Sequence, residues 1–352
     1  MKTFYRLLSV VALLSAAAGC HHDSATDPVR WQGQPTYQSL GAVRQLAFAT
    51  PSAGWVVGGY AVPVTASPWT NMLLHTTNGG NTWAGIDLTP VNTAAGFRSF
   101  AAVNDQLLYG VADDLPLSLV RGAQSRFVYR SENGGQTWQR LPSTGFFDGS
   151  LAFASPSVGV SPSSFQLVRT TDSGQSWQVA WTDPQQRHSV SQAQFVTPTV
   201  GYATGNCVLK TTDQGQTWQV LPWTHGLITQ ATFLSAELGF LVTSSGIICD
   251  PGPCPDMGPT SALYRTQDGG QTWQQLLAPA TGRFAFVSAH EFYRASSTIE
   301  HTSDEGQTWQ TEYTLPSASS GSPDSFVSIC FPAPEAGYAV TNNGLVVKRL
   351  TP

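Results

Sequence analysis

Side chains that could take part in recognition or acid-base chemistry are scarce in this 352-residue sequence, and they gather in a few short segments. One segment holds both signs of charge: Asp113, Asp114, Arg121 and Arg126. Further along, arginine, histidine and tryptophan occur together in stretches expected to be loops: Trp181, Arg187, His188, Trp223 and His225. Aromatic and arginine side chains on loops are typical of surfaces that recognise a peptide or a glycan. We treat these residues as candidates for one binding face.

The cysteines predict covalent links rather than catalysis. Cys249 and Cys254 flank an Asp-Pro-Gly-Pro segment, where a loop disulfide is plausible in an oxidising compartment. Metal binding by this pair is the alternative, although no His lies near it in the sequence. We expect Cys207 and Cys330 to be isolated, buried thiols on strands. No Ser-His-Asp arrangement, phosphate-binding loop or metal-ligand spacing occurs, so we predict no cofactor and no metal.

The N-terminus reads as an export signal. Two basic residues precede an uncharged, mostly apolar run from Leu7 to Ala18, and small residues come directly before Cys20. The run is too short to span a bilayer as a stable helix. Small residues before a cysteine resemble the lipobox of bacterial lipoproteins, in which that cysteine is lipidated; an ordinary signal peptide is the alternative. We predict a signal at 1–19, a tether at 20–29, and a membrane-anchored protein of the periplasm or cell surface.

Composition narrows the fold that must carry these residues. Only 11% of the residues are charged, against roughly 25% in ordinary soluble domains. The chain is not disordered, because 11% of it is aromatic, and it lacks the Glu and Lys that a helical bundle needs. A net charge of −5 leaves no basic footprint for nucleic acid. With 33 Gly and 23 Pro, the composition is typical of a large all-β protein.

An eight-residue pattern, Thr/Ser-x-Asp/Asn-x-Gly-x-Thr/Ser-Trp, occurs six times, and its Trp recurs every 36 to 55 residues. The Asx side chain can accept backbone N–H groups inside a tight turn, and the Gly two residues later permits an unusual backbone angle. The Asx residues are Asn78, Asn133, Asp172, Asp213, Asp268 and Asp304. We assign them to structural turns, not to calcium binding or catalysis.

A second repeated position divides the chain into seven units. A Phe can be placed at one equivalent position in each: Phe48, Phe100, Phe153, Phe195, Phe233, Phe286 and Phe331. In five units a Gly follows six residues later and opens another short strand. Four short strands in about 40 residues are typical of one blade of a β-propeller. The last unit ends before its turn, so residues around Trp31 to Leu40 are expected to supply its outer strand and close the ring.

These repeats resemble the Asp-box, or bacterial neuraminidase repeat, of sialidases, some glycan hydrolases and sortilin-type receptors. The longer pattern, from Gly201-Tyr202-Ala203 to Trp218, looks more like the photosystem II stability/assembly factor family. That resemblance covers roughly residues 40–352 and implies an exported seven-bladed β-propeller with four antiparallel strands per blade. It also implies that the Asp-box turns lie away from the binding face. A shared fold does not determine activity.

Strand alternation divides the connections between two faces. The turns between the first and second strands and the Asx turns share one face, called here the turn face. The loops between the second and third strands and the connections between blades share the other, the loop face. The long insertions all belong to the loop face: Gly59 to Asn71, Ala112 to Arg126, and Gly246 to Ser261. Long loops on a rigid scaffold are common binding sites.

Catalysis is the weaker interpretation. A glycosidase normally needs two positioned carboxylates, and Asp113 or Asp114 would be the acid/base. A sialidase-like site would also need clustered arginines, but Arg44, Arg98 and Arg283 stand four, two and three residues before the repeat Phe. Those offsets predict that they do not share one strand face.

We therefore predict a single propeller over 30–352, acting as a monomeric scaffold that binds a protein or glycan partner and is attached to the membrane through Cys20. A sialidase-like glycoside hydrolase is the alternative.

Overall fold

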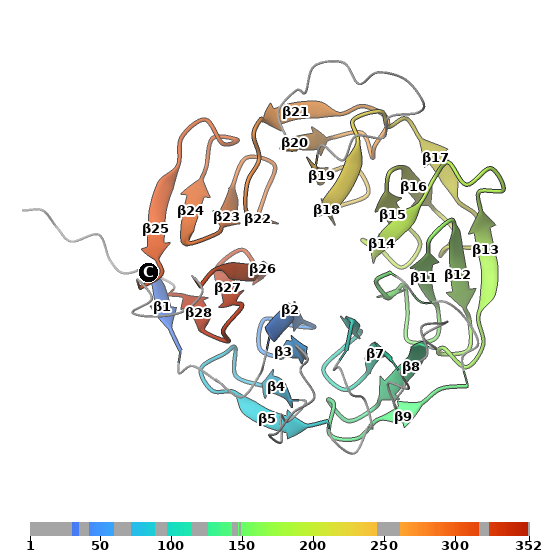
Figure 1. The fold of residues 1–352 in the computed structure, drawn as a ribbon, viewed down its shortest axis with the longest axis horizontal. Coiled ribbons are helices and arrows are strands. Elements are labelled where there is room, and N and C mark those ends of the chain that lie inside the picture. The colour runs from blue at the N-terminus through green and yellow to red at the C-terminus, as the bar shows by residue number, and fades with distance from the viewer. Residues whose placement is uncertain are drawn as a thin grey trace, which may run out of the picture.

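The computed structural model describes residues 30–34, 42–59, 72–88, 97–113, 126–142, 147, 149–244, 261–316 and 324–350. Its strands form seven four-stranded antiparallel sheets arranged as blades around a ring axis (Figure 1). The described residues contain no helix, and so none that could cross a membrane. The predicted all-β, seven-bladed propeller with four strands per blade is confirmed.

In blades 1 to 6 the strands run in chain order from an inner strand at the ring axis to an outer strand at the rim, and in blade 7 the N-terminal strand takes the outer place (Figure 1). Blade 1 comprises β2 (Ala42–Phe48), β3 (Gly54–Gly59), β4 (Met72–Thr76) and β5 (Ala84–Asp87). Blade 2 comprises β6 (Ser99–Ala102), β7 (Leu108–Asp113), β8 (Arg126–Ser131) and β9 (Gln139–Arg140). Blade 3 comprises β10 (Ala152–Phe153), β11 (Gly159–Ser163), β12 (Gln166–Thr170) and β13 (Gln178–Thr182). Blade 4 comprises β14 (Val190–Phe195), β15 (Gly201–Gly205), β16 (Val208–Thr211) and β17 (Gln219–Leu221).

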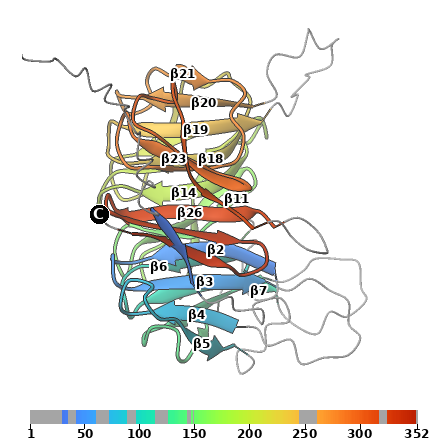
Figure 2. The ribbon, with the colours of Figure 1, turned by 90° about the vertical axis from the view of Figure 1, so that its left-hand side faces the viewer.

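The remaining blades follow the same plan, and Figure 2 shows the ring from its edge, with the turn face and the loop face on opposite sides. Blade 5 comprises β18 (Leu227–Phe233), β19 (Gly239–Ser244), β20 (Ser261–Thr266) and β21 (Gln274–Leu277). Blade 6 comprises β22 (Arg283–Phe286), β23 (Phe292–Ala295), β24 (Thr298–Thr302) and β25 (Gln310–Thr314). Blade 7 comprises β26 (Phe326–Ala333), β27 (Ala336–Thr341), β28 (Val346–Arg349) and β1 (Trp31–Gly33).

The repeated Phe and Gly are partners across the first hairpin of a blade. Phe233 pairs with Gly239, and a Cβ added to that glycine would lie 2.3 Å from the Phe233 ring. Only glycine leaves room for the ring, which explains the six-residue spacing. In blade 2 the predicted register is wrong: Ala102 pairs with Leu108, the residue that begins β7, so Ala102 and not Phe100 holds the position of the repeated Phe.

Aromatic stacking joins one blade to the next. An aromatic residue at the start of a second strand stacks on the inner-strand Phe of the following blade, and the centroid distances run from 3.6 to 4.5 Å in five of these pairs. The pairs are Tyr109 with Phe153, Tyr202 with Phe233, Phe240 with Phe286, Tyr293 with Phe331, and Tyr338 with Phe48. The last pair connects blade 7 to blade 1, so the stacking continues across the closure.

The Asx turns close as the sequence predicts. In blade 5, Asp268 Oδ1 accepts hydrogen bonds from the Thr266 hydroxyl at 2.8 Å and the Thr272 N–H at 2.9 Å. The Thr272 hydroxyl donates to the other carboxylate oxygen, and these contacts lower the pKa of Asp268 to about 2. Asn133 Oδ1 accepts the equivalent bonds in blade 2, where the Asx residue of the turn is uncharged.

The N-terminal strand closes the ring beside the C-terminal strand, as expected (Figure 1). Trp31 pairs with Arg349 and is 1% exposed. The Glu312 carboxylate, whose side chain is fully buried in β25, accepts hydrogen bonds from Arg30 Nη1 at 2.7 Å and Trp31 Nε1 at 2.8 Å. Closure therefore depends on a polar contact with blade 6 as well as on strand pairing.

Candidate functional site

The predicted insertions lie mostly outside the described residues, but their strand boundaries are known. Asp113 ends β7 and Arg126 begins β8, and the two are Cα partners. Ala112 and Arg126 are therefore strand residues rather than loop residues, and the connecting segment is 114–125. Asp114 and Arg121 fall in that segment, outside the described residues. Cys20, Cys249 and Cys254 also lie outside them.

The connection from blade 3 to blade 4 is held by Asp183. Its carboxylate accepts hydrogen bonds from the N–H groups of Gln185, Arg187 and His188 and contacts His188 Nδ1 at 2.8 Å. Burial raises the pKa of Asp183, but the hydrogen bonds from His188, Gln185 and Arg187 outweigh it and hold the pKa below its usual value. Arg187 and His188 thus lie on a loop-face connection with a defined shape.

Trp181 lies in a strand and not on a loop. It belongs to β13, is Cα partner to Leu167, and packs beside the buried cluster that contains Leu167 and Ala203. Its indole is half-buried. The structure therefore assigns Trp181 to packing between blades 3 and 4.

Trp223 and His225 occupy the connection from blade 4 to blade 5. The Trp223 indole donates to the Gly226 carbonyl at 2.8 Å and contacts Tyr264 and Trp273 edge-on. His225 is exposed and stacks on Tyr264 with ring centroids 4.7 Å apart. Trp223 packs blades 4 and 5 together, whereas the His225 ring faces solvent.

Three arginines meet where the inner strands reach the loop face. Arg44, Arg98 and Arg126 line one cavity of about 300 Å³, together with Gln45, Ser99, Ser150 and Ser191. None of the described residues that line it is acidic. Arg126 Nη1 donates to the Phe147 carbonyl at 3.2 Å, which holds the start of β8 against the segment that precedes blade 3. Arg44 and Arg98 line this cavity and Arg283 does not, so the three arginines that were predicted not to share one strand face are divided two and one.

A β-bulge lies at Arg44. The pairing of β2 with β3 shifts between Val43 and Gln45, so Arg44 is an extra residue that reverses the alternation before it. The same shift occurs four residues before the repeat Phe in β14, β18 and β26. Counting offsets along a regular strand therefore misassigns the face of residues before the bulge. Arg283 starts β22, which pairs without a shift, and it does not line this cavity.

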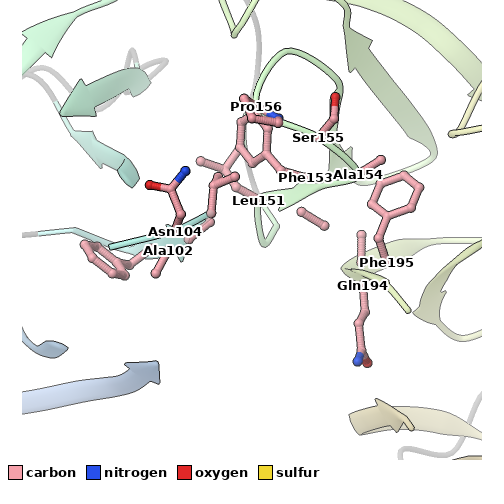
Figure 3. A pocket seen from close by; sticks show the side chains of 14 residues that line it. Ala102, Asn104, Leu151, Phe153, Ala154, Ser155, Pro156, Gln194 and Phe195 are labelled. Atoms are coloured by element: carbon pink, nitrogen blue, oxygen red, sulfur yellow. The ribbon is translucent and has the colours of Figure 1, made fainter. Parts of the chain in front are cut away.

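Two more cavities continue along the wall around the ring axis. The middle one, about 230 Å³, shares Ser150 with the arginine cavity and includes Gln192, Thr204 and Ala231. The largest, about 420 Å³, shares Ala193 and Gln194 with the middle cavity and reaches the turn face. Figure 3 shows Asn104, Phe153, Ser155 and Phe195 around the largest cavity, contributed by three successive blades. The three cavities adjoin one another from face to face.

Side-chain amides hold this wall in shape. Gln194 donates to the Phe233 carbonyl at 2.8 Å and accepts from the Phe233 N–H at 2.9 Å. Gln230 makes the same pair of bonds to Phe284 in the next blade. Gln45 donates to the Phe100 carbonyl at 3.1 Å. The inner strands of neighbouring blades are therefore joined by hydrogen bonds, and the cavities lie in a preorganised surface.

The remaining cysteines and possible metal ligands add no site. Cys207 is buried in the turn before β16, where burial raises its pKa to about 12, so it is not a strand residue as expected. Cys330 lies in β26, and burial raises its pKa to about 12 as well. Among the described residues no group of three His, Cys, Asp or Glu side chains could hold a metal ion.

Comparison with known proteins supports the fold. No family model matches the sequence, and no curated protein matches it. Among solved structures, "YCF48 bound to D1 peptide" is 18% identical with a TM-score of 0.61, over 92% of this chain and 97% of that one. YCF48 from Cyanidioschyzon merolae is 16% identical with a TM-score of 0.62, over 91% and 98%.

A xyloglucanase of glycoside hydrolase family 74 from Xanthomonas campestris is also similar. It is 16% identical with a TM-score of 0.63, and the match covers 92% of this chain but 54% of that one. The chain therefore spans about half the length of that enzyme. At these identities the likeness establishes the propeller fold and nothing finer.

Proposed function

We propose that the chain is an exported, lipid-anchored propeller that binds an extended segment of a partner protein on its loop face. The observation that carries the proposal is the cavity lined by Arg44, Arg98 and Arg126. Guanidinium groups form bidentate, charge-assisted hydrogen bonds with carboxylates, and arginine is enriched among the residues that dominate interfaces. A peptide with an acidic side chain or a free carboxyl end would meet that chemistry at the loop face.

Preorganisation supports the same proposal. The glutamine bonds between inner strands hold the wall before any ligand arrives, which reduces the ordering cost of binding. The similar YCF48 structure is described as bound to a peptide. That likeness makes a protein segment the first partner class to test, ahead of a glycan.

The binding test uses an array of extended peptides with and without acidic residues. Arg44 is exposed on the cavity, so Arg44→Ala is expected to weaken capture of acidic peptides about tenfold or more without unfolding the protein. Arg283→Ala is the matched control, because Arg283 is an exposed inner-strand arginine outside the cavity. Equal capture by both variants, or capture of neutral peptides alone, would refute the proposal.

Export and anchoring are tested separately. If Cys20 carries the lipid, Cys20→Ala moves the protein from the membrane fraction to the soluble fraction, and the sequence before Cys20 is removed from the wild-type protein. An unchanged membrane fraction would contradict the anchor.

The glycoside hydrolase alternative draws its support from the similar xyloglucanase. Against it, none of the described residues that line the three cavities is a carboxylate. Release of reducing sugar from xyloglucan that is lost in Asp113→Asn or Asp114→Asn would favour this alternative over peptide binding.

A further inference from the structure

The middle cavity of the wall contains a buried hydroxyl without a hydrogen-bond partner. Thr204 lies in β15, is 2% exposed, and its Oγ1 is bonded to no group among the described residues. The same side chain lines the 230 Å³ cavity between blades 4 and 5. A buried hydroxyl left unpaired is destabilising, so its presence calls for a reason.

The repeat itself does not require this hydroxyl. Thr204 is Cα partner to Gln192, the first paired residue after the bulge of β14. The residues at the same register in blades 1, 5 and 7 are Val57, Val242 and Val340. Valine has the shape of threonine without its polar group, so blade 4 differs from these three blades by a hydroxyl on a residue that lines the cavity.

The other polar side chains of the cavity are already engaged. Gln192 donates to the Thr229 carbonyl at 3.1 Å and accepts from the Ala231 N–H at 3.3 Å. Gln194 makes both of its bonds to Phe233. Ser150 Oγ accepts from the Ala193 N–H at 2.7 Å, which leaves the hydroxyl proton of Ser150 to be donated elsewhere. Thr204 and Ser150 are thus the groups that can serve a ligand.

We propose that this cavity is a subsite for an uncharged carboxamide side chain of the bound peptide. The inference rests on the proposed function, because the peptide would reach the subsite from the arginine cavity, with which it shares Ser150. No described residue that lines the cavity is charged, so a charged ligand group would be desolvated without a partner. A carboxamide offers an acceptor and donors to the two hydroxyls.

A sugar ring fits the cavity less well. The rings that line it, Tyr202 and Phe233, are stacked on each other with centroids 3.6 Å apart, and Phe233 is 2% exposed. Each ring covers one face of the other, and Tyr202 is only 1% exposed, so neither ring gives a pyranose an open flat surface on which to stack.

The direct test uses propionamide as the probe on the full propeller, with propionate and glucose beside it, followed through the methyl NMR signals of Ala231 and Ala193. Propionamide is expected to shift these signals saturably at millimolar concentration, about the affinity available to so small a ligand. Propionate and glucose are expected to cause no saturable shift. Saturation by glucose without propionamide would replace the proposal with a glycan site.

Substitutions at Thr204 separate its hydroxyl from its shape. Thr204→Val is expected to raise Tm and to weaken propionamide roughly three- to tenfold, the equivalent of one hydrogen bond. Thr204→Ser keeps the hydroxyl and is expected to bind nearly as the wild type. Equal binding by wild type and Thr204→Val would overturn the subsite.

Peptides distinguish this inference from the proposed function. Captured peptides that depend on Arg44 but bind Thr204→Val normally would sustain the function and reject the subsite. Propionamide binding that depends on Thr204, with no peptide captured at all, would sustain the subsite as a carboxamide site and reject the peptide function.

Discussion

Ring closure should depend on one buried carboxylate, and Glu312→Gln tests this. Glu312 lies in the outer strand of blade 6, yet it accepts hydrogen bonds from Arg30 and Trp31, which belong to the strand that completes blade 7. Its side chain is fully buried, and His301 Nδ1 lies 3.4 Å from the same oxygen that Arg30 contacts. Glutamine preserves the shape, but it removes the charge and replaces one acceptor with a donor.

The expected loss follows from these contacts. A hydrogen bond to a charged group contributes roughly 1.5–3 kcal/mol, and breaking a buried ion pair costs roughly 3–5 kcal/mol. Arg30 keeps 35% of its side-chain surface in water and can be hydrated again, which lowers the cost. We therefore expect Glu312→Gln to reduce the free energy of unfolding by about 2–3 kcal/mol.

The assay is urea denaturation followed by tryptophan fluorescence, with hydrogen exchange of the β1–β28 pairs as a local readout. The matched control is Glu300→Gln in the same blade, because Glu300 pairs with Arg294 at 2.7 Å but both side chains are about a quarter exposed. That change is expected to cost at most about 1 kcal/mol. If the two variants differ by less than about 0.5 kcal/mol, the closure does not depend on Glu312 as argued.

Three further outcomes are expected from other parts of the ring. The folded-state pKa of Asp268 is about 2, below its ordinary 3.8. Its contribution to stability is therefore present above about pH 4 and is lost as the pH falls toward 2. In Asp268→Asn, the free energy of unfolding measured by denaturation should change less with pH across that window. Gly239→Ala should lose about 1–3 kcal/mol in the same assay, because the new Cβ would lie 2.3 Å from the Phe233 ring. Asp183→Ala should loosen its connection and speed trypsin cleavage after Arg187.

Controls make these outcomes decisive. Asn78 and Asn133 already hold two of the turns, so Asp268→Asn should still fold; failure to fold would contradict the argument that the turn needs only the side-chain acceptor. Gly33→Ala has its nearest contact at 3.6 Å and should be tolerated; a loss equal to that of Gly239→Ala would dismiss the ring contact as the cause. Unchanged cleavage in Asp183→Ala would mean that other contacts shape the loop.

The sequence predicted the fold well because its strongest signals are local. An Asx turn closes within eight residues, and the Phe-to-Gly spacing reports one ring over one glycine, as at Phe233 and Gly239. The Asx turn and the Phe-to-Gly spacing recur along the chain, so each copy strengthens the prediction made from the others. Blade 2 shows the limit, since Ala102 and Leu108 stand where other blades have the Phe and the Gly, and the nearby Phe100 was assigned to that position instead.

The candidate site was harder to predict because it depends on irregularity. The bulge at Arg44 changes which way the residues before it point, and a bulge leaves no clear mark in the residue types. Trp181 and Trp223 were expected on a binding face because tryptophan suits binding, but both pack between blades. The sequence alone does not single out Thr204, because a threonine in a strand is ordinary. Strand pairing was needed to show that valine occupies the same position in other blades.

The pairing of Trp31 with Arg349 also governs the order in which the molecule can be completed. A chain made from its N-terminus produces β1 first, but the edge that β1 must cover appears with the final strand. Until then the Trp31 indole has no pocket, and the incomplete ring carries an uncovered strand edge at each end. Such edges pair readily with other chains. Slow release of the last residues during synthesis should therefore increase aggregation more than an equal delay earlier in the chain.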